Sequence, residues 1–314
     1  FDEANNIQWA RHLEESGVHV VYGLVGYKIH AKSCLVVRRE GHQIRRYVHL
    51  ATGNYNPATA KLYTDIGLLT CKPDFGEDIT TFFNLLTGIC QFQPLRKLLV
   101  APFELHDRLL QLIGRETEHA RRGLPAKIIA KLNSLAERQV IEALYAASQA
   151  GVEIDLIVRG ICCLRPGVKG LSENIKVRSI VDRFLEHSRV YYFENACQPK
   201  VFVASADWLP RNFFRRIELA FPVEDGVLRE RLINEILAVS LGDNTKARFL
   251  HSDGHYEQAR PSGKEPHRRS QFEFVSRGLA TAQETVKSVD GKSKFPRVKL
   301  VTSPFSSARK TAAD

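Results

Sequence analysis

Residues 26–40, GYKIHAKSCLVVRRE, place a histidine and a lysine two positions apart in an otherwise apolar run. The β-branched residues over 29–38 are typical of a buried β-strand. Because side chains alternate between the two faces of a strand, we expect His30 and Lys32 to project from the same face. A lone histidine on a strand is more often a satisfied core residue than a catalyst, so the pair needs further support before it indicates a site.

That support comes from a repeat between the two halves of the chain. The first pair is followed by a strand and by ATGNYNPATAKLYTDIGLL (51–69), and HSR (187–189) is followed by a strand and by ASADWLPRNFFRRIELAF (204–221). Each half holds an imidazole, a cation two residues later and a carboxylate on a following strand, namely His30, Lys32 and Asp65 in one half and His187, Arg189 and Glu218 in the other. The repeat predicts two similar lobes about a pseudo-twofold axis, with both histidines in one cleft.

Short apolar runs alternate with longer helical patterns, which is the signature of an α/β fold. Strands are expected over 18–22, 29–38, 45–53, 66–71, 97–102, 126–133, 152–160, 175–181, 189–195, 200–207 and 215–223. Helices are expected over 77–88, 103–122, 137–150 and near 226–241. We expect each lobe to be a mixed β-sheet flanked by helices. The first domain is predicted over 1–96, the second over 97–284, and a basic, flexible tail over 285–314.

Composition bounds the class of protein. The 314 residues are 44% apolar and 25% charged, which is ordinary for a globular chain of about two domains. No run approaches the ~20 apolar residues of a membrane span. The chain begins with Phe1 and has no Met, so we expect a piece of a longer protein. Its six cysteines are scattered without metal-ligand spacing, which favours reduced thiols over zinc or disulfides. The net charge of +10 suggests a polyanionic partner.

The repeated residues suit the chemistry of phosphoryl transfer. An imidazole nitrogen can attack phosphorus, and a second imidazole can donate a proton near neutral pH. Asp65 and Glu218 are expected to accept the far ring N–H of the histidines and so to fix their tautomers. Cations near the motifs would compensate the charge of the transferred group; they are Lys32, Arg159, Arg189, Arg215 and Arg216. The loop TGNYN, which contains Asn54, can direct backbone N–H groups at an anion.

Six motifs together carry a family resemblance: KIHAK, TGNYN, LYTD, IVRG, SIVDRFLEHSRVY and SADWLPRN. Through them the chain resembles bacterial polyphosphate kinase of the type built on the phospholipase D fold, from Phe1 to about residue 255. The resemblance implies the two C-terminal catalytic domains of that enzyme. The preceding domains, and with them the two magnesium-associated arginines of the family, would then lie before Phe1, so no metal-binding residue is expected in this chain.

The resemblance also implies roles for single residues. His30 corresponds to the histidine that the family phosphorylates, and Tyr63 and Arg159 to residues that contact the nucleotide. His187 corresponds to a ligand of the nucleotide phosphates and the proton donor to the departing group, and Arg216 to a further phosphate ligand. The implied reaction is reversible transfer of the γ-phosphate of ATP to polyphosphate, with Mg²⁺ as cofactor. The implied protein is a cytoplasmic homo-oligomer, with peripheral membrane association as an alternative and no nucleic-acid partner.

One departure and two alternatives remain at this stage. The second half carries arginine, not lysine, two residues after its histidine, which predicts unequal roles for His30 and His187. The first alternative is a phosphodiesterase or nuclease of the phospholipase D superfamily, which would use both histidines with water as the final acceptor. The second is a fragment that binds polyphosphate without turnover.

Overall fold

A computed structural model describes residues 3–288 of the chain. The chain divides into two compact units, residues 1–271 and 272–314. All elements below lie in the first unit, except that helix α8 (Ser270–Ser288) continues into the second. Among the described helices, none combines the length and the apolar character needed to cross a membrane.

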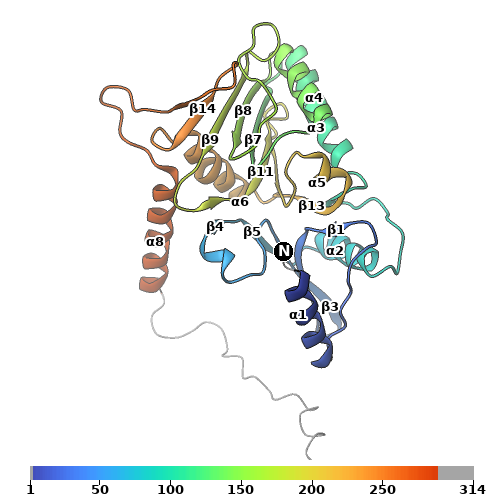
Figure 1. The fold of residues 1–314 in the computed structure, drawn as a ribbon. Helices are drawn as coiled ribbons and strands as arrows, with labels where there is room; N and C mark the ends of the chain where they lie inside the picture. The colour runs from blue at the N-terminus through green and yellow to red at the C-terminus, as the bar shows by residue number, and fades with distance from the viewer. Residues whose placement is uncertain (1–2, 289–314) are drawn as a thin grey trace, which may run out of the picture. The chain divides into compact units, whose positions relative to one another are not determined.

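The first unit is built around a large mixed sheet with the strand order β1-β13-β12-β11-β7-β8-β9-β14-β15, in which β6 also pairs with β13 (Figure 1). Strands β7, β8 and β9 are parallel to one another, whereas β11, β12 and β13 pair in antiparallel fashion. The strands are β1 (Lys28–Ile29), β6 (Leu99–Ala101), β7 (Lys127–Leu132), β8 (Glu153–Val158), β9 (Ile175–Ile180), β11 (Arg189–Phe193), β12 (Lys200–Ala204), β13 (Arg216–Pro222), β14 (Ala247–Leu250) and β15 (Tyr256–Gln258).

Helices cover the sheet because its strands are apolar on both faces. Tyr191 and Phe193 belong to a buried cluster with helices α3 (Leu105–Arg121) and α4 (Arg138–Gln149), which lie together on one side of β7 and β11 (Figure 1). Val190 and Tyr192 belong to a second cluster, on the other face. That cluster includes side chains of α2 (Pro73–Leu86) and of a π-helical turn, η2 (Leu232–Leu237), between α6 (Gly226–Arg231) and α7 (Ala238–Leu241). Helix α5 (Pro210–Phe214) precedes β13.

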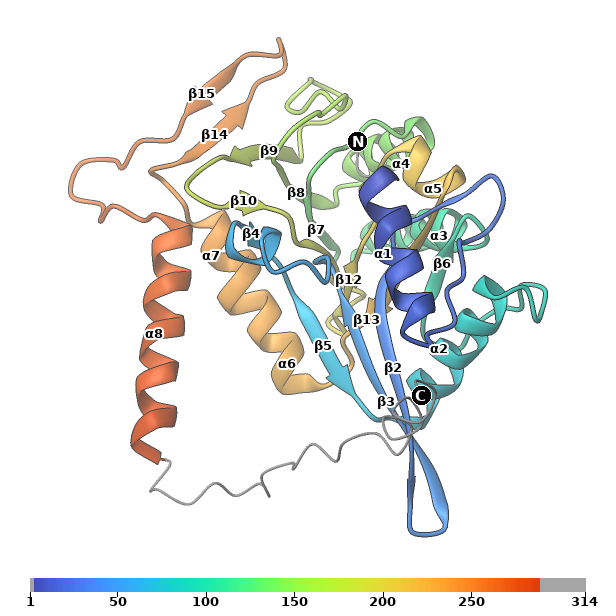
Figure 2. The ribbon, with the colours of Figure 1, turned by 60° about the horizontal axis from the view of Figure 1, so that its bottom comes forward.

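The first half of the chain also forms a smaller sheet of its own. Strands β2 (Lys32–Glu40) and β3 (Gln43–Ala51) form a long hairpin with β5 (Gly67–Thr70) beside it (Figure 2), in the order β2-β3-β5. All pairings in this sheet are antiparallel. Two short strands of this half instead join the second half: β1 pairs with β13, and β4 (Tyr63–Thr64), which follows the 3₁₀ turn η1 (Thr59–Lys61), pairs with β10 (Leu185–Glu186).

The expected α/β class is confirmed, and most predicted elements lie where they were placed. The first half differs in that its own sheet is antiparallel, because a tight hairpin joins its strands where a crossover helix would be needed for parallel pairing. The strand predicted over 18–22 is wrong: Val18, Val21 and Tyr22 are exposed, and no described strand pairs with them. Helices α1 (Glu3–Glu15) and α8 were not predicted. All six cysteines are free thiols. The tail beyond residue 288 lies outside the described residues.

Candidate active site

The single strand predicted over 29–38 is interrupted at His30. The backbone N–H groups of His30 and Ala31 both donate to the carbonyl oxygen of Ile217, over 2.9 and 3.0 Å. Two residues facing one partner residue form a β-bulge, which ends strand β1 and redirects the side chain. The alternation argument for His30 and Lys32 is therefore wrong, because the two residues do not belong to one regular strand.

The imidazole of His30 is held by a buried carboxylate from the second half of the chain. Its Nδ1 lies 2.8 Å from Oε2 of Glu218 on β13, whose side chain is fully buried. Ser205 and Asn212 also donate to Glu218, each over 2.5 Å, so the carboxylate cannot turn away. Because an ionised carboxylate only accepts hydrogen bonds, Nδ1 carries the proton of the neutral ring and Nε2 carries the lone pair. The His30 side chain is 22% exposed, which leaves it accessible to a ligand.

His187 has the same arrangement with a carboxylate from the first half. Its Nδ1 lies 2.7 Å from Oδ1 of Asp65, which follows strand β4. Thr52 donates to the same oxygen over 2.6 Å, and its hydroxyl accepts from the backbone N–H of Ile66. The ring of Tyr63 packs against the imidazole, with centroids 5.0 Å apart. The proton of the neutral His187 ring is therefore also on Nδ1, and Nε2 is available.

The two hydrogen bonds cross between the halves of the chain. The first half supplies His30 and Asp65, and the second supplies His187 and Glu218. Each histidine is hydrogen-bonded to the carboxylate of the opposite half. The structure brings together the four residues of the sequence repeat, and each carboxylate accepts a hydrogen bond from a ring nitrogen, as expected. The repeat did not show which carboxylate serves which histidine, since that depends on how the two halves meet.

The cations two residues after each histidine make equivalent backbone contacts but have different surroundings. Lys32 Nζ donates to the carbonyl of His30 over 2.5 Å, and Arg189 Nη1 donates to that of His187 over 2.6 Å. Arg189 also forms a two-pronged ion pair with Asp207, over 3.2 and 3.1 Å. Lys32 has no ion-pair partner within 4 Å among the described residues, so its charge can pair with a phosphate oxygen. Arg189 already pairs with Asp207.

Burial and neighbouring charges shift the pKa values of the site. Burial lowers the pKa of Lys32 from 10.5 to about 8, against the opposing effect of Glu218, and nearby Arg189 lowers it further. Burial also lowers the pKa of His187, although its hydrogen bond to Asp65 acts in the opposite direction. Burial alone would raise the pKa of Asp65, but hydrogen bonds, above all that from His187, hold it below its usual value.

The remaining predicted ligands differ in how closely they approach this site. Arg159 interacts electrostatically with Asp207 and Tyr63, burial lowers its pKa, and its buried Nη1 has no hydrogen-bond partner. An unsatisfied buried guanidinium nitrogen is costly, which favours a ligand there. Arg216 is half-buried at the start of β13 and lies within electrostatic range of Lys32. Asn54 is exposed, and none of its described contacts involves either histidine.

The sequence analysis did not identify the residues that donate hydrogen bonds to the two carboxylates. Ser205, Asn212 and Thr52 fix the two carboxylates, and they lie inside the motifs SADWLPRN and TGNYN. Gly53 is needed for packing, because a Cβ there would lie 2.6 Å from the carboxyl carbon of Asp65. A small or polar residue at these motif positions could have drawn attention to them. Sequence spacing alone does not show which carboxylate each of them contacts.

Behind His187 a buried ion pair is also present. Lys131 Nζ lies 2.7 Å from Oε2 of Glu186 and donates to the hydroxyl of Ser188, so it contacts the residues on both sides of His187. Thr64, next to Asp65, donates to Glu186 and accepts from the backbone N–H of His187. The histidine backbone is therefore fixed by contacts from both halves.

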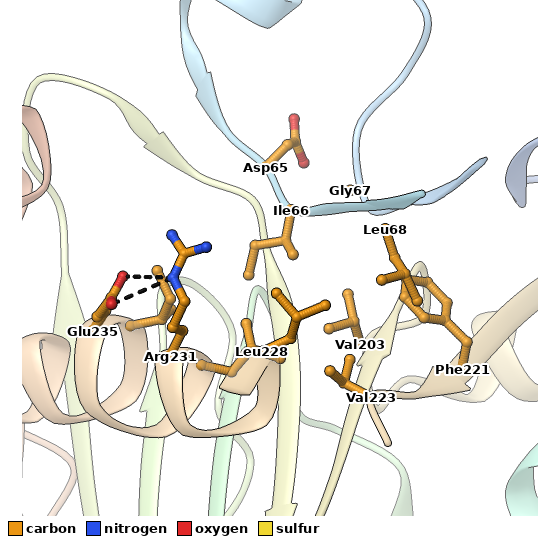
Figure 3. A pocket seen from close by; sticks show the side chains of 12 residues that line it. Asp65, Ile66, Gly67, Leu68, Val203, Phe221, Val223, Leu228, Arg231 and Glu235 are labelled. Atoms are coloured by element: carbon orange, nitrogen blue, oxygen red, sulfur yellow. Dashed lines mark hydrogen bonds and ion pairs between the residues drawn. The ribbon is translucent and has the colours of Figure 1, made fainter. Parts of the chain in front are cut away.

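A neighbouring cavity of about 290 Å³ is lined by neither His30 nor His187. It is lined mainly by apolar side chains of β5, β12, β13 and the helical segment 228–236, with the ion pair of Arg231 and Glu235 at one side (Figure 3). Asp65 lies at its edge with the carboxylate turned away from the cavity (Figure 3). The cavity thus adjoins the backbone of Asp65, whereas the carboxylate, which bonds His187, points away from the cavity.

The carboxylates beside the histidines are mostly engaged by protein groups, so they do not form a magnesium site by themselves. Both oxygens of Glu218 accept hydrogen bonds from protein groups, and Oδ1 of Asp65 accepts from His187 and Thr52, which leaves only Oδ2 of Asp65 without such a bond among the described residues. Mg²⁺ is held by free carboxylates together with substrate phosphates. Within the described residues, one group of three potential metal ligands gathers, and it lies elsewhere, on the β14–β15 hairpin at 251–257.

Comparisons with known proteins match almost the whole of the described chain. The family model for polyphosphate kinase C-terminal domain 1 matches residues 1–92, and that for C-terminal domain 2 matches residues 98–271. A polyphosphate kinase of Synechocystis sp. is 55% identical over 284 residues, covering 90% of this chain and 39% of the relative. One of Neisseria meningitidis serogroup B is 56% identical over 262 residues, covering 83% of this chain and 38% of the relative.

A solved structure agrees with these matches. The crystal structure of polyphosphate kinase from Porphyromonas gingivalis superposes with a TM-score of 0.82 at 39% identity, covering 89% of this chain and 43% of that one. The chain spans about two fifths of the length of the relatives it matches. The two family models and the superposition together show that the chain belongs to the polyphosphate kinase family and corresponds to its C-terminal domains.

Proposed function

We propose that the protein transfers the γ-phosphate of ATP to inorganic polyphosphate, reversibly, through a phosphohistidine on His30. The observation that carries the proposal is the crossed pair of histidines, each with Nδ1 on a fixed carboxylate and Nε2 available, in a chain of the polyphosphate kinase family. Family membership supports ATP and polyphosphate as substrates, and the geometry supports histidine as the phosphate carrier.

In the first step, Nε2 of His30 attacks the γ-phosphorus of ATP. The N–P bond forms as the bond between that phosphorus and the bridging oxygen breaks, and the electron pair leaves with ADP. Glu218 stabilises the positive charge that develops on the ring, because it is buried and bonded at Nδ1. Lys32, Arg159 and Arg216 would compensate the charge on the equatorial oxygens.

In the second step, a terminal oxygen of polyphosphate attacks the phosphorus on His30. The N–P bond breaks, its electron pair returns to Nε2, and the polymer is one phosphate longer. The same steps in reverse form ATP from polyphosphate. His30 is a good carrier because its carboxylate partner stabilises the ring in both states.

His187 acts as the proton donor to the departing phosphate oxygen. Burial lowers its pKa, so without substrate its ring is neutral at pH 7. The negative charge of bound phosphates favours the protonated ring, and the hydrogen bond that Nδ1 donates to Asp65 stabilises it further. The acid is therefore formed only when a substrate is in place. We propose that Mg²⁺ enters as the counter-ion of the nucleotide, where it supplies charge compensation for the phosphate oxygens.

The proposal is tested by incubating the protein with γ-labelled ATP and with polyphosphate. We expect an acid-labile, base-stable label on the wild type and on His187→Ala at a reduced rate, and none on His30→Ala. Hydrolysis of phosphodiesters without such a label would instead support the phosphodiesterase alternative. Binding of polyphosphate without label or ATP consumption would show that this chain is a binding fragment only.

A further inference from the structure

We propose that the β14–β15 hairpin binds one divalent transition-metal ion of the Zn²⁺ class through His251, His255 and Glu257. One potential ligand atom of each of these three residues lies within 4.8 Å of the others, and within the described residues no other group of this kind is found. The site is separate from the histidine pair of the proposed reaction and does not depend on it.

The backbone of the hairpin places these side chains on one face. His251 donates its backbone N–H to the carbonyl of His255 over 2.9 Å, so the two residues face each other across the turn. Side chains opposite each other in an antiparallel pair lie on the same face. Glu257 is two residues beyond His255 on β15, and it therefore lies on that face as well. The shared face of the three side chains follows from strand register.

The turn itself is fixed, which preorganises the ligands. Gly254 has φ +96°, a value that suits glycine, and its N–H donates to the carbonyl of His251 over 3.0 Å. Asp253 accepts from the backbone N–H of His255 over 3.1 Å. A short loop held in this way loses little conformational entropy when an ion joins its two strands.

Asp253 provides an independent indication of a metal site. Its Oδ1 lies 2.6 Å from Nδ1 of His255, so Nδ1 of that ring carries the proton and Nε2 is left unprotonated. Metal-binding histidines usually donate their other ring N–H to a carboxylate in this way, which orients the ring and makes it a better ligand. Asp253 would therefore be the positioning residue, and Nε2 of His255 the ligand atom.

The other two ligands already contact each other where an ion would bind. His251 Nε2 lies 3.0 Å from Oε2 of Glu257, and an ion would replace this hydrogen bond. The two imidazoles are parallel, with centroids 4.3 Å apart. The side chains of His251 and His255 are 41% and 58% exposed, so His251 can turn its free nitrogen toward an ion beside the ring that Asp253 orients. Water would complete the coordination.

The ligand set selects the class of metal. Two imidazoles and one carboxylate suit Zn²⁺, Ni²⁺ or Cu²⁺, whereas Mg²⁺ prefers six oxygen ligands. The expectation that the cysteine spacing provides no zinc site is not affected, since no thiolate takes part. Strand β14 pairs with β9 of the large sheet, so an ion at the turn would join the free edge strand β15 to a strand anchored in the core.

The experiment is a calorimetric titration of the full chain with ZnCl₂, and in parallel with MgCl₂, in the absence of nucleotide. We expect the double variant His251→Ala/His255→Ala to bind one equivalent of Zn²⁺ less than the wild type. Asp253→Asn should weaken this equivalent about 10- to 100-fold. The matched control is His42→Ala, an exposed histidine in the β2–β3 turn, which should bind like the wild type.

Other zinc-binding groups, including the active-site histidines, are present in all these variants and cancel in the comparison. Equal Zn²⁺ stoichiometry and affinity in the wild type and the double variant would overturn the proposal. An equivalent of Mg²⁺ lost in the double variant would overturn the assignment to transition metals. Circular dichroism of each variant, together with the conservative His255→Gln, which should lose the same equivalent, separates loss of a ligand from loss of the fold.

Discussion

Lys32 determines how the proposed first step depends on pH. Its pKa is lowered to about 8, mainly by burial, so in the free protein it loses its charge as the pH rises through about 8. We expect kcat/KM for ATP to fall above an apparent pKa near 8. Bound phosphate raises the pKa of the ammonium group, so the fall in kcat should lie at higher pH.

The substitution Lys32→Arg provides the check on this prediction. A guanidinium group stays charged throughout the accessible range, so the alkaline fall in kcat/KM should disappear even if the rate at pH 7 is lower. Lys61→Arg is a suitable control, since Lys61 is exposed in η1 and the alkaline fall should remain. The assignment to Lys32 would be disproved by an unchanged alkaline fall in Lys32→Arg.

Gly53 tests the position of Asp65 without changing any polar group. A methyl group at residue 53 would lie 2.6 Å from the Asp65 carboxyl carbon, so the carboxylate must move away from His187. We expect Gly53→Ala to lower turnover by about 10²-fold, the loss typical of a displacement of ~1 Å. Gly114→Ala on helix α3 is the matched control, because nothing lies within 4 Å of its new Cβ, and it should keep full activity. Equal activity of both variants would contradict the prediction.

At the scale of the elements, periodic patterns could be predicted and contacts between distant segments could not. The helices at 105–121 and 138–149 and the strands at 127–132 and 153–158 follow from apolar periodicity, and they lie close to the expected ranges. The break at His30 could not be predicted, because it depends on Ile217, which is distant in sequence. The run 18–22 has strand-like composition, but no described strand pairs with it.

The buried ion pair between β7 and β10 predicts a stability effect. Lys131 and Glu186 are 3% and 6% exposed, so removing the ammonium group leaves an uncompensated buried carboxylate. We expect Lys131→Met to lower the free energy of unfolding by about 3–5 kcal/mol. The double variant Lys131→Met/Glu186→Gln should lose less, since no buried charge remains and the amide can still bind Gln271.

Urea denaturation of the three proteins measures these losses. Arg138→Met is the control, because Arg138 pairs with Glu142 on an exposed helix face. This substitution should lower the free energy of unfolding by less than about 1 kcal/mol. A single variant that is as stable as the double variant would show that the carboxylate is not left unpaired. Phosphohistidine formation in the double variant would then report how far this pair positions His187.

At the scale of the whole chain, the reciprocal pairing explains what the repeat could and could not predict. Duplicated motifs identified His30, Asp65, His187 and Glu218, because each half keeps the same residue types in the same order. The exchange of carboxylates is the contact pattern expected when two similar lobes meet about a twofold axis, but it arises only in the assembled unit. The domain boundary at 96/97 stays a prediction, since both lobes fall within one compact unit.

The exchange predicts that a substitution in one half perturbs the histidine of the other. In long-range ¹H–¹⁵N spectra of the imidazoles, Asp65→Asn should alter the tautomer signals of His187 and leave those of His30 unchanged. Glu218→Gln should do the opposite. Because folding depresses the pKa of Asp65, the stability that its ionised form contributes is present above about pH 3.8 and is lost as the pH falls through the lower folded-state value. Asp65→Asn should therefore make the free energy of unfolding fall less steeply as the pH drops below about 3.8. In the NMR spectra, changed signals of the histidine in the same half as the substitution would contradict the crossed pairing.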